Sequence, residues 1–186
     1  MYPLLRFAKE IAVHRSAPKL GLFDTHVGHH LCWPIDIDLW MELNNGRTLT
    51  LFDLGRVVLF LRNGIHAKMR AQGWVGTVAG SSVRYRRRVQ MFDRLEMRSR
   101  LIGWDAKFLY SEQAMFRGGE CTSHGLFRSA ATDRKRMIPW RRPRAPWATA
   151  TARPCPAGCA PGPRPTTPAP GRRCRISAFR APADAV

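Results

Sequence analysis

The chain has 186 residues, which is enough for one domain of ordinary size with a real core. Its formal net charge of +18 indicates an anionic partner, and nucleic acid, a membrane surface or a phosphate-rich small molecule would each satisfy that charge. The five cysteines include no CxxC pair and demand no disulfide, so we expect a reducing, cytoplasmic location.

At its amino end, the chain mixes apolar residues with charged ones. Charges interrupt the apolar runs of residues 1–19, so these runs are too short for a signal peptide or a membrane span. We predict an amphipathic helix here, which either docks on the folded body or makes a peripheral contact with a membrane surface.

The first predicted strand covers residues 26–33 and ends before Pro34. A long helix follows, with Asn44 or Asn45 as its N-cap. Gly64 is expected to bend this helix, and residues 66–72 add a further turn or two before Gly73 stops them. The predicted core face of the helix, at spacings of three and four, consists of Leu51, Leu54, Val58, Leu61 and Ile65.

After the helix, the apolar residues recur with a period of two. We predict strands over 74–85, continuing to 89, and over 95–101, then turn residues at 103–106. Phe108, Tyr110, Ala114 and Phe116 share one face of the next strand. Gly118 and Gly119 predict a two-residue hairpin, and a last strand follows over 121–132. The predicted fold class is therefore α+β, with one long central helix against a curved antiparallel meander of about four strands.

From Pro139 to the carboxyl end the composition changes. Residues 139–186 contain eleven prolines, eleven alanines, nine arginines and one acid, with no period of 2 or 3.6. Such a segment buries too little apolar surface to offset its ordering entropy, so we predict a disordered tail of charge +8 behind a body of charge +10. GC-rich codons in an unintended reading frame would give the same composition, and we hypothesise that the tail is a frameshift product.

Two aspartates precede the helix at a spacing that would allow a carboxylate to act as a catalytic group at the helix N-terminus. Asp36 and Asp38 lie in an extended segment, about seven residues before the helix start at Asn44, Asn45 and Gly46. A carboxylate that faces a helix N-terminus can act on a carbonyl whose oxygen the helix end polarises. This pattern predicts hydrolase chemistry. The spacing alone also allows either aspartate to cap a turn.

These residues resemble a known signature. The chain is similar to hotdog-fold thioesterases of the 4-hydroxybenzoyl-CoA thioesterase type, whose motif runs Asp-x-Asp-x-x-Gly-His-x-Asn-Asn. The matching residues are Asp36, Asp38, Asn44 and Asn45, then Asp53 and Arg56 for an acid-x-x-Arg on the helix. The stretch 101–110 resembles a subgroup of uncharacterised thioesterase-like proteins. The resemblance implies a hotdog domain over 20–138 that hydrolyses acyl-CoA-type thioesters and assembles as a homodimer or homotetramer.

The resemblance also implies roles for individual residues. Asp38 takes the place of the catalytic carboxylate, as nucleophile or general base. The amides of Asn45 and Gly46 would bind the oxyanion, and Asn44 stands beside them at the substrate end of the helix. Glu42 either substitutes as a base or is simply exposed.

Three positions depart from the family motif. Met41 stands where the family has Gly, Glu42 where it has His, and Thr48 where it usually has Tyr. The first two departures alter the loop beside the acid. They favour the alternative function, a catalytically silent protein that binds acyl thioesters or lipids on the same scaffold. Asp53 and Arg56, at i and i+3, are predicted to form a structural ion pair rather than to act as catalysts.

Arg84, Arg86, Arg87 and Arg88 form the densest cluster of charge in the body. They could bind the 3′-phosphate and pyrophosphate of coenzyme A, or they could be a solvated strand edge blunted by charge. Nucleic acid is not the predicted partner, because no RNP-like aromatic pair accompanies Tyr85 among the arginines.

The remaining reactive side chains are expected to be structural. On a strand, His26 and His30 share a face and His29 points away, but no acid or cysteine at ligand spacing completes a metal site. Packing or lining a substrate is therefore the interpretation for these histidines. Cys32 and Cys121 are predicted to be small core residues. We predict no metal and no redox cofactor.

Overall fold

The computed structural model describes residues 3–133 and 136–138, so the predicted tail over 139–186 and the frameshift hypothesis lie outside the described residues. The elements in chain order are α1 (Leu4–His14), β1 (His26–Leu31), the short 3-10 helix η1 (Pro34–Asp36), α2 (Asn45–Arg62), α3 (Ile65–Ala71), β2 (Val75–Tyr85), β3 (Arg94–Trp104), β4 (Leu109–Arg117), β5 (Glu120–Asp133) and β6 (Arg136–Ile138).

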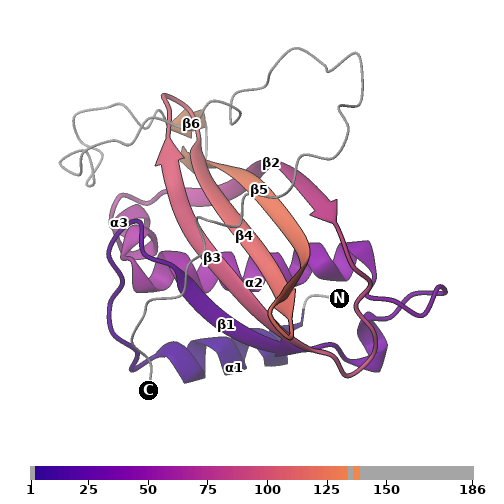
Figure 1. The fold of residues 1–186 in the computed structure, drawn as a ribbon. Helices are drawn as coiled ribbons and strands as arrows, with labels where there is room; N and C mark the ends of the chain where they lie inside the picture. The colour runs from indigo at the N-terminus through magenta and orange to yellow at the C-terminus, as the bar shows by residue number, and fades with distance from the viewer. Residues whose placement is uncertain (1–2, 134–135, 139–186) are drawn as a thin grey trace, which may run out of the picture.

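The strands form one antiparallel sheet in the order β1-β3-β4-β5-β2, and β6 pairs with β5. The sheet curls around the long helix α2, and α1 lies beside β1 at one end of it (Figure 1). One long helix wrapped by a curved antiparallel sheet is the α+β hotdog architecture, which confirms the predicted fold class.

One detail of the predicted topology is wrong. The expected meander of four strands would place β2 next to β3, but of these four strands only β3, β4 and β5 follow each other as neighbours. Strand β2 instead lies at the outer edge, where it pairs with β5 from Val75 opposite Thr132 to Tyr85 opposite Ser123. The period of two identifies each strand but carries no information on which strands pair, and pairing between distant segments decides the order.

The strand predicted to continue to residue 89 ends at Tyr85. The backbone N–H groups of Arg86 and Arg87 both donate to the carbonyl oxygen of Thr122, at 2.8 and 3.1 Å. Two residues on one strand thus oppose one acceptor on the other, which breaks the ladder and bends the chain away from β5. Strand β1 is also shorter than predicted and ends at Leu31.

Helix α2 contributes a set of fully buried apolar side chains to the core. Four of the five predicted core residues, Leu51, Leu54, Val58 and Ile65, are buried, but Leu61 is 38% exposed. Leu61 lies at the rim of a hollow between α1 and the end of α2, where the covering helix stops. Phe52 and Leu59 were not predicted as core residues, but both are fully buried because the curled sheet covers more than one face of the helix.

Glycines mark the turns that the sequence predicted. Gly64 has φ +78° and separates α2 from α3, while Gly73 has φ +69° just after α3. Gly118 and Gly119 have φ +55° and +84°, as a type I′ hairpin requires, and they join β4 to β5. All four positions occupy the left-handed region that favours glycine.

The amino-terminal helix α1 docks on α2. Its only buried residue among those described is Glu10, whereas Leu4 and Leu5 are 68% and 89% exposed. The face that α1 turns to the body is therefore partly polar, which the amphipathic pattern did not predict. No helix within residues 3–133 and 136–138 is long and apolar enough to cross a membrane.

Candidate active site

The amino end of α2 is closed by a side-chain cap. Asn44 is the N-cap, and its Oδ1 accepts hydrogen bonds from the N–H groups of Gly46 at 2.8 Å and Arg47 at 3.3 Å. The prediction of a free Gly46 amide is therefore wrong for this structure, because the cap consumes that donor. The Asn45 amide has no acceptor among the described residues, so it is the donor that the helix end presents.

Asp38 organises the loop before the helix. Its Oδ1 accepts from the backbone N–H groups of Trp40 at 2.9 Å and Glu42 at 3.4 Å, and its own N–H donates to the Glu42 carbonyl at 2.9 Å. Asp38 thus caps a turn, as its residue type allows. No hydrogen bond to its Oδ2 is found within the described part of the chain.

Met41, at the tip of this loop, has φ +59°. The left-handed region is unfavourable for a residue with a Cβ atom, and the family that the motif resembles has Gly at this position. The chain therefore keeps the loop conformation and accepts the strain of a larger residue. The Met41 side chain is 65% exposed, so packing does not compensate for this strain.

Asp36 is a structural residue. It is 2% exposed, and its carboxylate contacts the guanidinium of Arg6 and accepts from the Trp33 N–H at 2.9 Å. Its carbonyl oxygen accepts from the Asn44 N–H at 2.9 Å. Asp36 thereby fixes both α1 and the first residue of the α2 cap.

A cavity of ≈ 250 Å³ lies at this end of α2. It is lined by Glu42, Leu43, Asn45, Thr48, Tyr85, Arg86, Arg87, Arg88, Val89, Thr122 and Ser123. The fold thus brings together five of the nine predicted site residues: Glu42, Asn45 and the three consecutive arginines. The other four, Asp38, Asn44, Gly46 and Arg84, are not among its lining residues.

Sequence reasoning missed the polar wall that β5 contributes to this cavity. Thr122 and Ser123 reach it because β5 pairs with β2, and only the pairing of distant strands places them there. No local pattern in the sequence indicates it.

The three arginines of the cavity differ in their partners. Arg88 Nε lies 3.2 Å from Glu42 Oε2, and Arg87 Nε lies 2.6 Å from Glu120 Oε1. No carboxylate among the described residues pairs with Arg86. Arg86 is therefore the cation of the cavity most available to a bound anion.

Arg84 lies on β2 opposite His124 of β5. It is exposed and is not among the residues that line the cavity. The structure therefore gives Arg84 the second interpretation of the arginine cluster, a charged and solvated strand edge.

Asp53 and Arg56 form the predicted ion pair, with Nη2 and Oδ1 2.5 Å apart. Arg56 is 5% exposed and also donates to Gln113 Oε1 at 3.0 Å. Gln113 in turn donates to the Phe52 carbonyl at 2.7 Å and to Ser99 Oγ at 2.8 Å. This buried network joins α2 to β3 and β4, so its role is structural.

Both cysteines of the body are buried and free, which confirms the prediction that they are core residues. Burial, with smaller contributions from nearby carboxylates, raises the pKa of the Cys32 thiol to about 11. A thiol with so high a pKa is a poor nucleophile at neutral pH.

A curled antiparallel sheet around one long helix, with a polar cavity at the helix N-terminus, defines a hotdog-fold protein of the thioesterase type. The family model of the thioesterase-like superfamily matches residues 32–154. The chain belongs to this superfamily.

Curated relatives share part of the sequence. Protein THEM6 of Xenopus laevis is 35% identical over 92 residues, which are 50% of this chain and 44% of that protein. Protein THEM6 of Drosophila melanogaster is 30% identical over 120 residues, which are 64% of this chain and 60% of that protein. The chain spans about half the length of the curated relatives it matches.

Solved structures share the fold. A probable thioesterase from Escherichia coli, YbaW, superposes with a TM-score of 0.58 at 19% identity over 61% of this chain and 89% of that one. A DHNA-CoA thioesterase from Staphylococcus aureus superposes with a TM-score of 0.58 at 16% identity over 66% of this chain and 85% of that one. At this identity the likeness establishes the fold.

Proposed function

We propose that the chain hydrolyses acyl-CoA-type thioesters in the cavity at the amino end of α2. The observation that carries this proposal is that a helix-end amide and a cluster of arginines line one cavity, next to the loop in which backbone amides hold the Asp38 carboxylate. Thioester hydrolysis needs a base, an oxyanion donor and a site for the phosphates of the carrier. Membership of the thioesterase-like superfamily supports the same chemistry.

Asp38 is the proposed general base. Two backbone amides hold its Oδ1, which fixes the orientation of the carboxylate and leaves Oδ2 for a water molecule. Oδ2 takes a proton from the water as the water oxygen attacks the thioester carbonyl carbon. The carbon–sulfur bond then breaks, and the proton from Asp38 passes to the leaving thiolate.

The Asn45 amide is the proposed oxyanion donor. It points outward from the start of α2, where the helix dipole favours negative charge. The Gly46 amide stays with its Asn44 cap, so Asn44 contributes by shaping the helix end rather than by touching the oxyanion. Glu42 is paired with Arg88, and we assign it to holding that arginine at the cavity wall.

A homodimer is proposed as the working form. Strand β2 is an edge strand of 11 residues, and no other strand of the described chain pairs with its outer side. An exposed edge of this length is a template for pairing with a second copy. Light scattering should give a dimer or larger at micromolar concentration, and a folded monomer would contradict this assembly. A cytoplasmic location is part of the same proposal.

Free thiol release from a panel of acyl-CoAs of different chain lengths tests the function. Asp38→Asn keeps the size of the side chain and removes the charge, so kcat should fall on the order of 10²–10⁴-fold with little change in KM. Asp24→Asn, at an exposed turn away from the cavity lining, is the matched control and should keep full turnover.

Three other outcomes have distinct meanings. Full turnover by the Asp38→Asn variant together with loss in Glu42→Gln would transfer the role of the base to Glu42, which lines the cavity. Binding of acyl-CoA by the parent protein without any turnover would establish the silent binder instead. The capped Gly46 amide favours that second function, because it leaves a single donor for the oxyanion. If the parent protein neither binds nor hydrolyses any acyl-CoA, both functions are refuted.

A further inference from the structure

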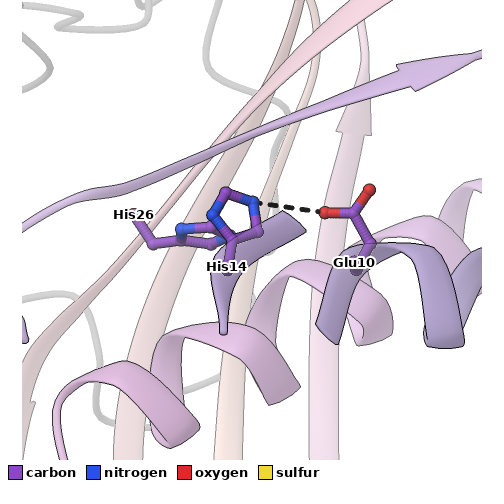
Figure 2. A group of neighbouring side chains, drawn as sticks. All are labelled: Glu10, His14 and His26. Carbon is purple, nitrogen blue, oxygen red and sulfur yellow. Dashed lines mark ion pairs between the residues drawn. The ribbon is translucent and has the colours of Figure 1, made fainter. Parts of the chain in front are cut away.

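Four titratable side chains meet between α1 and β1, away from the candidate active site. His26 and His30 lie on the same face of β1, with Gly28 between them, and Glu10 and His14 come from α1. Figure 2 shows Glu10 and His14 one turn apart on the helix, with the His26 ring against His14. The sequence did not predict a metal site here because it offered no acid at ligand spacing. The docking of α1 supplies that acid.

The distances within this cluster suit a small cation. Glu10 Oε2 lies 3.5 Å from His14 Nε2, and one ligand atom each of Glu10, His14 and His26 lie within 4.8 Å of one another. A tetrahedral zinc ion with bonds of about 2.0–2.1 Å holds neighbouring ligand atoms roughly 3.4 Å apart. Glu10, His14 and His26 therefore need only small side-chain movements to close on an ion.

Gly28 leaves the space in which such an ion would sit. A Cβ atom at Gly28 would lie 3.4 Å from Glu10 Oε2, 3.4 Å from His26 Nε2 and 3.9 Å from His30 Nε2. Three potential ligand atoms thus converge on one point beside a residue that has no side chain. Because every one of these contacts is an ordinary van der Waals distance, Gly28→Ala fits the fold while filling this space.

Two of these ligand atoms have no partner of their own. His26 is fully buried and His30 is 6% exposed, and the Nε2 atoms of both rings make no hydrogen bond. A buried polar atom without a partner costs about 1–3 kcal/mol, and a bound ion would satisfy both atoms at once.

Two cations border the cluster. Lys9 Nζ lies 3.1 Å from Glu10 Oε1, which leaves Oε2 for the ion. Arg62 Nη1 lies 3.0 Å from His26 Nδ1, so the ring proton of His26 is on Nε2 in this arrangement. For His26 Nε2 to bind the ion, it must first lose this proton. Nδ1 must then take up a proton for the ring to stay neutral, so it gives up the hydrogen bond that it accepts from Arg62. Arg62 would keep its second hydrogen bond, to the Pro18 carbonyl at 3.0 Å.

We propose that Glu10, His14, His26 and His30 bind one divalent zinc-type cation, which fastens α1 to β1. Imidazole nitrogens with one carboxylate oxygen are a zinc donor set, and four ligands complete a structural tetrahedral site. A closed site of this kind stabilises the fold and takes no part in thioester hydrolysis. The proposal therefore stands whether or not the chain is a thioesterase.

Isothermal titration of EDTA-treated full-length protein with Zn²⁺ tests the site, with elemental analysis of the dialysed complex for stoichiometry. Gly28→Ala and Glu10→Gln should each weaken the binding at least tenfold. His29→Asn is the matched control, because His29 is on the same strand but faces outward and is 74% exposed. The parent and the control should each bind one Zn²⁺, and Zn²⁺ should raise their melting temperatures more than those of Gly28→Ala and Glu10→Gln.

Co²⁺ separates this site from one made by thiols of the chain. A Co²⁺ complex of the parent protein should show the visible bands of tetrahedral nitrogen and oxygen ligation without a thiolate charge-transfer band, and Gly28→Ala should lose those bands. Arg62→Gln should tighten Zn²⁺ binding, because it removes the competitor for His26 Nδ1. The proposal is overturned if the parent binds no Zn²⁺, if thiolates bind it, or if Gly28→Ala and Glu10→Gln bind as tightly as the parent.

Discussion

The Arg6 guanidinium forms a bidentate ion pair with the buried Asp36 carboxylate, in which Nη1 donates to Oδ1 at 3.1 Å and Nη2 donates to Oδ2 at 2.5 Å. Asp36 is 2% exposed, and its next cation, Arg47, is 3.9 Å away. The pair joins α1 to the segment that leads into the α2 cap. The amino-terminal helix therefore helps to hold the loop that carries Asp38.

Arg6→Met should destabilise the protein by about 3 kcal/mol, because it leaves a buried carboxylate without its main partner. For a chain of this size the melting temperature should fall by about 6–12 °C. Scanning calorimetry measures this change, with the exposed Arg84→Met as the control. Adding Asp36→Asn to Arg6→Met should recover part of the loss, since the unpaired charge is then gone. Equal melting temperatures for parent and Arg6→Met would show that the pair contributes nothing.

Replacing Met41 with glycine, unlike replacing Arg6, is not expected to destabilise the protein. Met41 has φ +59°, a region that costs a residue with a Cβ about 1–2 kcal/mol, while glycine costs some chain entropy in return. Met41→Gly should therefore leave stability unchanged or raise the melting temperature by up to about 4 °C. Met41→Ala also removes the exposed side chain but keeps the Cβ, so it should give no such gain. A clear loss of stability in Met41→Gly alone would mean that the strain is absent.

Acid should destabilise the metal-free protein through its buried histidines. Burial, with nearby cations, lowers the pKa of His26 to about 3, and burial lowers the pKa of His30 to about 4 against the opposing charge of Glu10. Unfolded histidine titrates near 6.5. The unfolded state thus binds more protons below pH 6.5, so stability is full above this pH and is lost as the pH falls toward 4.

Between pH 7.5 and 5.5 each imidazole should cost about 1.4 kcal/mol, the free energy of one pKa unit. Urea titrations in EDTA at the two values measure the change, and EDTA keeps metal ligation from altering it. His30→Gln should show a smaller dependence than the parent, and His29→Asn, which alters an exposed ring, should keep the parental one. Identical urea midpoints at both pH values would contradict the neutral buried state of these rings.

The elements of the fold were largely predictable because their information is local. Spacings of three and four located the central helix, and Asn44 and Gly64 located its ends. The place of β2 at the sheet edge was not predictable, because it depends on pairing with β5 across about fifty residues. The burial of Phe52 and Leu59 was also not predictable from local spacing. A helix wrapped by a sheet has a wider buried face than a period of 3.6 implies.

The same difference between local and long-range information applies to the residues of the candidate site. The motif located Asp38, Asn45 and Glu42 at the helix start, because these residues are close in the chain. The motif could not show that Asn44 consumes the Gly46 amide, since that depends on a side-chain rotamer. The motif also could not show that the Thr122 carbonyl oxygen accepts a hydrogen bond from the Arg86 N–H. This contact places the arginine segment at the cavity.

The arginines of the cavity should differ in their effect on the carrier. Arg86 lines the cavity and has no acid partner among the described residues, whereas Arg87 is engaged by Glu120. A charge-assisted hydrogen bond is worth about 1.5–3 kcal/mol, so Arg86→Gln should raise KM for acyl-CoA about tenfold or more. Arg87→Gln should change KM little, because its exposed ion pair contributes less than about 1 kcal/mol.

Short acyl thioesters that lack the nucleotide serve as the second substrate. Steady-state kinetics on both substrates should show the Arg86→Gln effect with acyl-CoA alone, since the short substrate has no phosphate to lose. Equal rises of KM with both substrates would mean that Arg86 shapes the cavity rather than binding phosphate. A larger effect from Arg87→Gln than from Arg86→Gln would mean that the Glu120 pair opens on binding and that Arg87 is the phosphate ligand.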